Sequence, residues 1–327
     1  MHITILGGGG FLGRKLAERL AKDGSVGGRS VSSLTLFDLN VPPALSAPFP
    51  VKCLGGDVTS ATDLAAAIPP ETDAVVHLAA VVSAAAEADL DLGLKVNIQG
   101  TLAVLNACRA LPKPPRVLFT SSVASFGGGQ DANLPDEARQ VPGNSYGAQK
   151  AIGELLLQDA TRRGIMDAIS IRLPTVVVRP GRPNKAASSF FSGILREPLL
   201  GLETECPVGD GFRVWVCSPR RAVEWFLQML VMDTAALGVD RGVNPPGLCV
   251  TVGEMLAALE AVGGPAARAL VKRVPDASVE AIVGGWPASF TADRARKLGF
   301  SAHESLEEVV RNFVIDDLAA TKAERGL

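Results

Sequence analysis

Tyr146 and Lys150 stand four residues apart in a stretch that predicts a helix, downstream of Ser121-Ser122. Residues i and i+4 of a helix lie on one face, which would place the phenol beside the ammonium. A free tyrosine has a pKa of about 10, and a cation within about 4–6 Å lowers it by favouring the phenolate. Tyr146 is the single tyrosine of the chain and could then act as a base near neutral pH. The alternative is a half-buried helix with a solvated lysine.

A glycine-rich turn follows the first predicted strand, His2–Leu6, and precedes a helical pattern over residues 11–21. Gly7, Gly10 and Gly13 have the spacing of a dinucleotide-binding turn. The first glycine permits the tight turn, the second lets a pyrophosphate approach the backbone, and the third lets helix and strand pack closely. The helix N-terminus would offer unpaired N–H groups to the phosphates. A plain flexible turn is the alternative.

Acidic residues follow the next two predicted strands. Asp38 ends the strand at residues 34–37, and its carboxylate can accept hydrogen bonds from both adenosine ribose hydroxyls. It would repel a 2′-phosphate, and no arginine follows directly, which favours NAD over NADP. Asp57 follows a short strand at 51–54 and could meet the adenine amino group. A turn aspartate explains Asp57 equally well.

Strands continue to alternate with helices, which predicts the α/β class with a Rossmann-type doubly wound parallel sheet. The strand over 74–80 ends in small residues that leave room for a cofactor, while His77 reads as a packed strand residue. The alternation of strands and helices ends beyond Pro174. We therefore predict an NAD-binding domain over residues 1–174, with pieces near 212–245 returning to it. Residues 175–211 and 246–327 would form a smaller, interleaved C-terminal lobe that binds the substrate.

Composition excludes several classes of function. The net charge of −2 and the few aromatic residues give no support for nucleic-acid binding, and no apolar run is long enough to span a membrane. Five scattered cysteines indicate reduced thiols in a cytoplasmic protein. Three dispersed histidines predict no metal site.

Taken together, the pieces resemble the extended short-chain dehydrogenase/reductase family, in family order and spacing over roughly the first half of the chain. The matching pieces are Gly7/Gly10/Gly13, Asp38, Asp57-Val58, His77-Leu78-Ala79-Ala80, Asn97-x-x-Gly100-Thr101, Ser121-Ser122 and Tyr146-x-x-x-Lys150. Three further stretches, at 145–155, 172–181 and 218–224, resemble a subfamily that oxidises D-erythronate, a four-carbon sugar acid, at C2 with NAD. Relatives with this framework are often labelled nucleotide-sugar epimerases.

The resemblance implies a role for each matching residue. Tyr146 would be the base, Lys150 would lower its pKa and hold the nicotinamide ribose, and Ser122 would bind the substrate oxygen. The expected NAD contacts are Gly7, Gly10, Phe11, Leu12, Gly13, Asp38, Asp57, Val58, Leu78, Ala79, Ala80, Asn97, Tyr146, Lys150 and Pro174. The expected substrate contacts are Ser83, Ser122, Tyr146, Thr175 and Arg179.

The substrate contacts rest partly on chemistry, because a sugar acid brings a carboxylate that prefers a cation or N–H donors. Arg179 follows the sixth strand directly and is favoured over Arg182, Lys185 and Arg213. Solvated surface charge is the alternative for each of them. Ser83 is either a polar contact or a helix cap.

Three functions follow from these features. The first is NAD-dependent oxidation of a small-molecule sugar acid. The second is a nucleotide-sugar epimerase or dehydratase with tightly bound NAD. The third is a non-catalytic NAD sensor, which the intact Ser122, Tyr146 and Lys150 set disfavours. The resemblance also implies a homodimer, for which the helices at 94–110 and 151–163 are candidates.

Overall fold

The computed structural model describes residues 1–183, 188–302 and 304–327. The chain divides into two compact units. The first comprises Met1–Ser125, Asn144–Arg172 and Val223–Val243, and the second comprises Phe126–Gly143, Leu173–Ala222 and Asn244–Leu327. Within the described residues, no helix combines the length and the apolar character that crossing a membrane requires.

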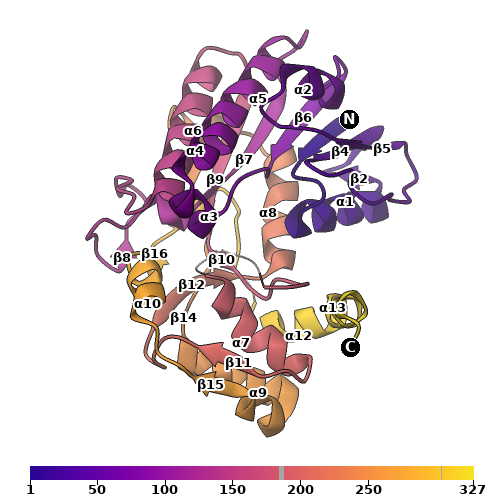
Figure 1. The fold of residues 1–327 in the computed structure, drawn as a ribbon. Helices are drawn as coiled ribbons and strands as arrows, with labels where there is room; N and C mark the ends of the chain where they lie inside the picture. The colour runs from indigo at the N-terminus through magenta and orange to yellow at the C-terminus, as the bar shows by residue number, and fades with distance from the viewer. Residues whose placement is uncertain (184–187, 303) are drawn as a thin grey trace. The chain divides into compact units, whose positions relative to one another are not determined.

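A seven-stranded sheet forms the centre of the first unit (Figure 1). Its strand order is β13 (Gly242–Val243), β9 (Asp167–Leu173), β7 (Arg116–Ser122), β6 (Thr72–His77), β1 (His2–Leu6), β4 (Ser33–Asp38) and β5 (Val51–Gly55). The defined pairings are parallel. All five residues of β1 are buried, as expected for a parallel strand covered on both faces. The predicted fold class is confirmed.

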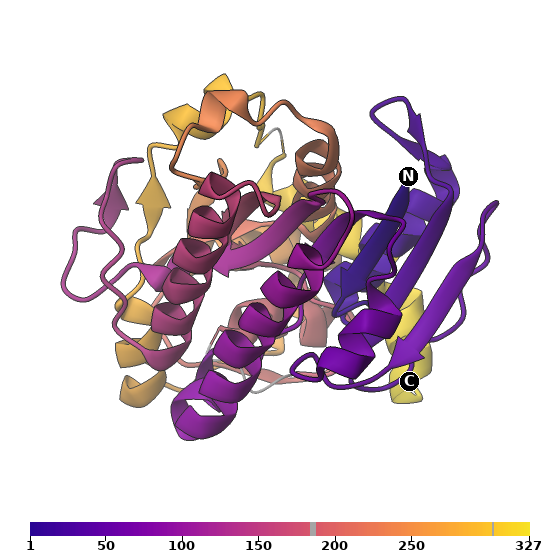
Figure 2. The same cartoon turned by 90° about the horizontal axis from the view of Figure 1, so that it is seen from above.

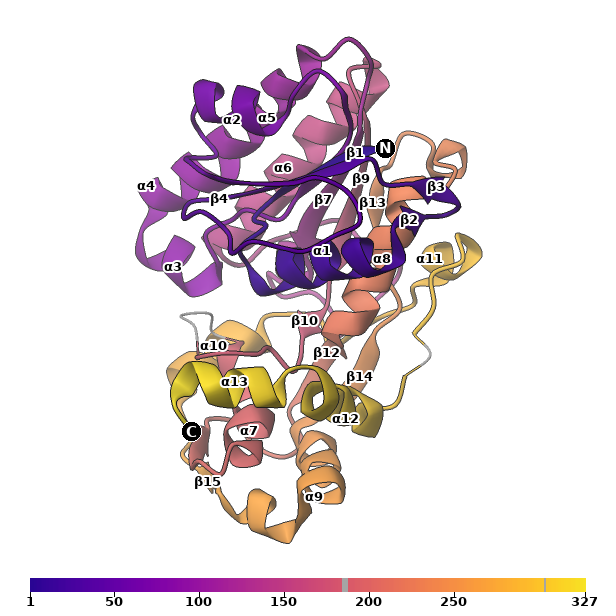
Figure 3. The same ribbon diagram turned by 90° about the vertical axis from the view of Figure 1, so that its right-hand side faces the viewer.

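Helices cover both faces of this sheet (Figure 3). On one face lie α2 (Ala61–Ala67), α5 (Gly100–Arg109) and α6 (Ser145–Arg162), and on the other lies α1 (Phe11–Asp23). Buried side chains such as Val75, Val104 and Leu157 join the sheet to α2, α5 and α6 in one core. Helices α5 and α6 run side by side (Figure 2).

Three local details differ from the sequence-based predictions. The strand predicted to reach Ala80 ends at His77, because the N–H groups of Leu78 and Ala79 both donate to the Leu6 carbonyl, at 2.8 and 3.0 Å. The helix predicted from Leu94 begins as the π-helix η1 (Leu94–Gln99), after α3 (Ser83–Ala88) and α4 (Leu90–Gly93). Residues 24–33 contain a short hairpin of β2 (Ser25–Val26) and β3 (Arg29–Ser30) that the sequence reasoning did not predict.

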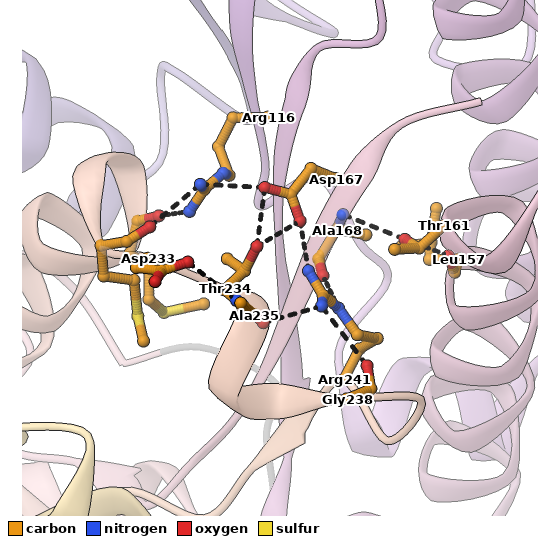
Figure 4. Close-up of polar contacts among 12 residues, drawn as sticks. Arg116, Leu157, Thr161, Asp167, Ala168, Asp233, Thr234, Ala235, Gly238 and Arg241 are labelled. Carbon is orange, nitrogen blue, oxygen red and sulfur yellow. Dashed lines mark hydrogen bonds and ion pairs between the residues drawn. The ribbon is translucent and has the colours of Figure 1, made fainter. Parts of the chain in front are cut away.

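A charged cluster lies at the amino ends of β7 and β9 (Figure 4). Arg116 and Arg241 both pair with Asp167, and Thr234 donates to the same carboxylate at 2.9 and 3.0 Å. Arg116 also donates to the carbonyls of residues 229 and 232, at 2.7 and 3.0 Å. The cluster therefore fixes the segment after α8 (Pro219–Val231), including η3 (Ala235–Leu237), against the sheet.

The second unit has its own core. A three-stranded sheet orders β10 (Thr175–Val176), β12 (Arg213–Cys217) and β14 (Leu248–Thr251), and two-stranded sheets pair β11 (Thr204–Cys206) with β15 (Val271–Arg273) and β8 (Asn133–Leu134) with β16 (Ser289–Phe290). Its helices are α7 (Ser189–Leu199), α9 (Val252–Ala269), α10 (Ala277–Gly284), α11 (Asp293–Lys297), α12 (Leu306–Asp316) and α13 (Leu318–Arg325). Thr251 and Glu254 form a capping box at the start of α9.

Candidate active site

The glycine turn between β1 and α1 has the geometry that a dinucleotide phosphate requires. Gly7 has a φ of +89°, and a Cβ there would lie 2.8 Å from the Ala79 nitrogen. A Cβ on Gly13 would lie 2.3 Å from the Gly7 carbonyl oxygen, so only glycine allows this approach of helix and turn. Gly10 is the N-cap of α1, and the first N–H groups of a helix have no intrahelical partner. Phe11 and Leu12 thus present backbone donors suited to an anion.

A pocket of about 470 Å³ opens at the carboxyl ends of β1, β4, β5 and β6, within the first unit. This is the edge where ligands bind in doubly wound sheets, and the volume suits a cofactor. Eight predicted NAD contacts line it: Gly7, Gly10, Asp38, Asp57, Val58, Leu78, Ala79 and Ala80. The sequence reasoning missed six lining residues, all close in the chain to predicted pieces: Phe37, Leu39, Gly56, Val81, Leu92 and Val96.

Asp38 is held in place at the rim of this pocket by backbone donors. Its Oδ2 accepts a hydrogen bond from the Gly9 N–H at 2.9 Å, and its Oδ1 accepts one from the Leu39 N–H at 2.8 Å. A fixed carboxylate at this position retains lone pairs for ribose hydroxyls and opposes a 2′-phosphate. The residues present therefore fit NAD.

Asp57 is occupied by contacts within the protein. Its Oδ1 accepts hydrogen bonds from the N–H and the hydroxyl of Thr59, at 2.9 and 2.8 Å, and its Oδ2 pairs with Lys95 at 3.2 Å. The Thr59 bonds first, and then Lys95, hold the pKa of Asp57 below its ordinary value. The turn role is therefore present, and the contact with adenine stays a prediction.

Asn97 lies in the π-helix η1, behind the pocket wall. Its amide accepts from the Val81 N–H at 2.8 Å and donates to the Val81 carbonyl at 3.0 Å, which fixes a residue that lines the pocket. It also donates to Gln149 of α6 at 2.7 Å. Asn97 thereby links the pocket wall to the helix that carries Tyr146 and Lys150. A direct contact with NAD stays a prediction.

Helix α6 begins at Ser145, with Asn144 as N-cap accepting from the Gly147 N–H at 2.8 Å. It presents Tyr146 and Lys150 on one face, as the spacing predicts. The Lys150 Nζ lies 5.6 Å from the centroid of the Tyr146 ring and 4.7 Å from that of Phe119. Lys150 is only 3% exposed. Burial lowers its pKa to about 7, and Glu154 acts in the opposite direction.

Ser122 ends β7 and lies where the strand meets η2 (Val123–Ser125), both of which pack against α6. Its hydroxyl accepts from the Ala124 N–H at 3.1 Å, which leaves the hydroxyl proton available for a substrate oxygen. The neighbouring Ser121 hydroxyl is buried without a hydrogen-bond partner within the described residues. The structure thus brings Ser122, Tyr146 and Lys150 to one region of the first unit.

His77 occupies a structural position, whereas the role of Ser83 stays a prediction. The His77 ring is buried against Phe119, and its Nε2 lies 3.2 Å from the Thr101 hydroxyl. Burial, and then the charge of Lys150, lower the pKa of His77 to about 3, so it is neutral at physiological pH. Ser83 is the first residue of α3, whereas Val82 occupies the N-cap position.

The remaining predicted contacts belong to the second unit. Thr175 is buried in β10, immediately after Pro174. The Arg179 guanidinium donates to the Val176 carbonyl and to the Ser188 hydroxyl, both at 3.1 Å, so it is held by that unit itself. Arg213 donates to the Cys249 sulfur at 3.1 Å. Lys185 lies outside the described residues.

Three residues around Lys150 were missed by the sequence reasoning: Phe119, Glu154 and Arg172. Phe119 supplies the ring beneath the ammonium. Glu154 follows Lys150 by one helical turn, a signal that the sequence does contain, and it pairs with Arg172 at 2.8 Å. The partner of Glu154, Arg172, comes from the strand β9, so no local pattern around Glu154 indicated it.

Comparison with known proteins agrees with this geometry. Residues 3–216 match the NAD dependent epimerase/dehydratase family. The chain is 47% identical over 320 residues to the D-erythronate dehydrogenase of Cupriavidus necator, covering 97% of this chain and 98% of that protein. It is 39% identical to the D-erythronate dehydrogenase of Haemophilus influenzae, covering 97% and 100%. The crystal structure of a nucleoside-diphosphate-sugar epimerase from Agrobacterium tumefaciens superposes with a TM-score of 0.91 at 45% identity, covering 98% and 95%. The chain therefore belongs to the NAD dependent epimerase/dehydratase family, and NAD is its cofactor.

Proposed function

We propose that this protein is an NAD-dependent dehydrogenase that oxidises the C2 hydroxyl of D-erythronate to the 2-oxo acid. The observation that carries the proposal is the face of α6, where a buried lysine lies 5.6 Å from the ring of the single tyrosine. Two relatives that match nearly the whole chain carry the name of this activity, which supports the substrate.

In the proposed mechanism Tyr146 accepts the hydroxyl proton of the substrate. The Lys150 ammonium stabilises the phenolate that this role requires. Ser122 donates its hydroxyl proton to the substrate oxygen and orients the reacting C–O bond. When bound, NAD supplies the acceptor for the hydride that leaves C2. The glycine turn and Asp38 hold the phosphate and ribose portions of the cofactor.

The test is the formation of NADH by purified protein given NAD and a panel of four-carbon sugar acids, with D-erythronate and L-threonate included. We expect steady NADH absorbance with D-erythronate. Activity on another acid alone would refute the substrate but keep the dehydrogenase. No NADH formation with any acid of the panel, together with NAD that copurifies with the protein, would refute the dehydrogenase.

A nucleotide-sugar epimerase is the second candidate, favoured by the 45% identity to the Agrobacterium tumefaciens protein of that name. The two functions differ in the fate of the cofactor. An epimerase keeps NAD bound and forms no net NADH, whereas a dehydrogenase releases NADH at each turnover. A UDP-sugar added to the same assay, with the product analysed by chromatography, separates them.

We further propose that Thr175 and Arg179 of the second unit are contacts of the sugar acid, and Ser83 of the first unit stays a separate predicted contact. Buried Thr175 follows β9 with Pro174 between them, and the Arg179 guanidinium is fixed by two hydrogen bonds, which support this role. Replacement of Arg179 by Ala should raise KM for D-erythronate with KM for NAD unchanged. Equal effects on both constants would contradict the assignment.

We also propose a cytoplasmic homodimer. All five cysteines are free, which supports a reducing compartment. Leu102 of α5 and Ile152 and Leu155 of α6 are 38, 42 and 61% exposed, and a second copy would cover these apolar side chains. Sedimentation of the wild type and of Leu155→Glu tests the dimer: we expect a dimer and a monomer, respectively, and a monomeric wild type would refute it.

A further inference from the structure

Helix α6 carries a third polar residue on its catalytic face. Glu154 follows Lys150 by four residues, as Lys150 follows Tyr146, so the three side chains lie along one face of the helix. Glu154 is 5% exposed. A carboxylate is rarely buried to this degree unless a partner compensates for the lost hydration.

Arg172, near the end of β9, is that partner. Its Nε donates to both Glu154 oxygens, at 3.2 and 3.0 Å, and its Nη2 donates to Oε2 at 2.8 Å. A Cβ on Gly242 would lie 2.3 Å from this Nη2 and 3.0 Å from the Glu154 Oε2. Glycine at the start of β13 therefore leaves the space that the ion pair fills.

The charges that face Lys150 from the surrounding elements are few. Glu154 contributes from α6 itself, and its effect opposes that of burial. His77 of β6 is neutral because its pKa is about 3. Phe119 of β7 offers an aromatic face, and Arg172 of β9 lies beyond Glu154. Among the described residues, Glu154 is thus the group whose charge favours the ammonium form of Lys150.

We propose that Glu154 and Arg172 form a positioning pair for catalysis: the carboxylate keeps Lys150 charged beside Tyr146, and the guanidinium holds that carboxylate in place. The inference rests on the proposed role of Tyr146 as the base. The pair does not touch the substrate, and it acts through Lys150.

The direction of the effect follows from the charges. Without the Glu154 carboxylate, burial alone acts on Lys150, and its pKa falls further. Lys150 is then neutral over more of the working pH range, and the Tyr146 phenolate loses its stabilising cation. The acid limb, which is the rise of kcat/KM with pH on the acidic side of the profile, must therefore move to higher pH. Loss of Arg172 leaves the buried Glu154 carboxylate without the ion pair that fixes it, so it has the same sign.

The experiment measures kcat/KM for D-erythronate against pH at saturating NAD. For Glu154→Gln, which conserves shape, we expect the acid limb to move up by about one pH unit or more, because a one-unit shift is a tenfold change in the ionised fraction. The loss of activity should be about tenfold or more at neutral pH and should largely disappear at high pH. Arg172→Met should shift the limb in the same direction.

Two further variants keep the test decisive. Gly242→Ala crowds the ion pair, the guanidinium most closely, while Lys150, Glu154 and Arg172 all remain present, and should shift the limb in the same direction by less. Asp167→Asn removes an ion pair at the other end of β9 and is the matched control: it should lower the thermal midpoint and leave the limb in place. A limb that moves equally in Asp167→Asn would overturn the inference.

Tyr146→Phe separates this inference from the proposed function. If Tyr146→Phe stays active, Tyr146 is not the base, and the proposed positioning pair is refuted as well. If Tyr146→Phe is inactive while Glu154→Gln and Gly242→Ala keep the wild-type limb, only the pair is refuted. A uniform loss of activity at every pH in Glu154→Gln would mark a structural role alone and would also refute it.

Discussion

Charge is buried at both ends of β7 and β9, but Lys150 at the carboxyl ends is compensated differently from the arginines at the amino ends. At the amino ends, Arg116 and Arg241 share the Asp167 carboxylate and donate to nearby carbonyls. At the carboxyl ends, Lys150 lies against the rings of Phe119 and Tyr146, with no carboxylate within ion-pair distance among the described residues.

The difference separates a structural charge from one that we propose to be functional. A buried arginine that is paired with a carboxylate and donates to carbonyl oxygens keeps its charge over a wide pH range and joins elements of the fold. A buried ammonium without a direct ion pair loses much of its preference for the proton, and burial lowers the pKa of Lys150 to about 7. Groups that titrate near neutral pH are suited to acid–base chemistry.

Replacement of Tyr146 by Phe should have the largest effect, and it should affect activity alone. The variant lacks the proposed base, so kcat for D-erythronate should fall by about 10²–10⁴-fold or more. NAD binding, followed by fluorescence titration, and the thermal midpoint should stay close to those of the wild type. Near-normal turnover would contradict the proposed base.

Replacement of Asp167 by Asn should have the opposite pattern. It leaves two arginines of the amino-end cluster without their shared carboxylate, so the free energy of unfolding should fall by about 2 kcal/mol. The effect is below that for a fully buried pair because the Asp167 side chain is 36% exposed. Urea denaturation measures the change, and kcat measured well below the unfolding temperature should be unaltered.

Replacement of Lys150 by Met should stabilise the NAD-free protein while it reduces activity. In the wild type the pKa of Lys150 is about 7 folded and about 10.4 unfolded. Between these values the unfolded chain binds one proton more, so wild-type stability rises with pH there. The gain from Met should be on the order of 3 kcal/mol at or below neutral pH and should shrink towards pH 10. Urea denaturation at pH 6, 8 and 10 checks the trend, and a pH-independent difference would contradict it.

The contrast between the two ends also explains which features the sequence could predict. The glycine turn, Asp38 and the Tyr146–Lys150 pair depend on local spacing along one strand or helix, and local spacing is visible in a sequence. The partners of Asp167 and Glu154 come from segments that are distant in the chain, such as Arg241 and Arg172, so no local pattern reveals them. The π-helix that places Asn97 against Val81 likewise had no signal in the helical pattern.

Replacement of Asp38 by Ala should have a smaller effect, confined to the binding of the cofactor. It extends the comparison to a second charged residue at the carboxyl ends of the parallel strands. Asp38 is held by two backbone N–H groups and lines the pocket, so its loss should leave the fold intact. KM for NAD should rise about tenfold, the worth of one or two hydrogen bonds to a charged group, and the preference against NADP should relax because the repelling carboxylate is gone. The ratio of kcat/KM for NAD to that for NADP measures the change, with Asp38→Glu as the control that keeps the charge. An unchanged ratio in Asp38→Ala would place the selectivity elsewhere in the pocket, with Leu39 as the adjacent lining residue to examine next.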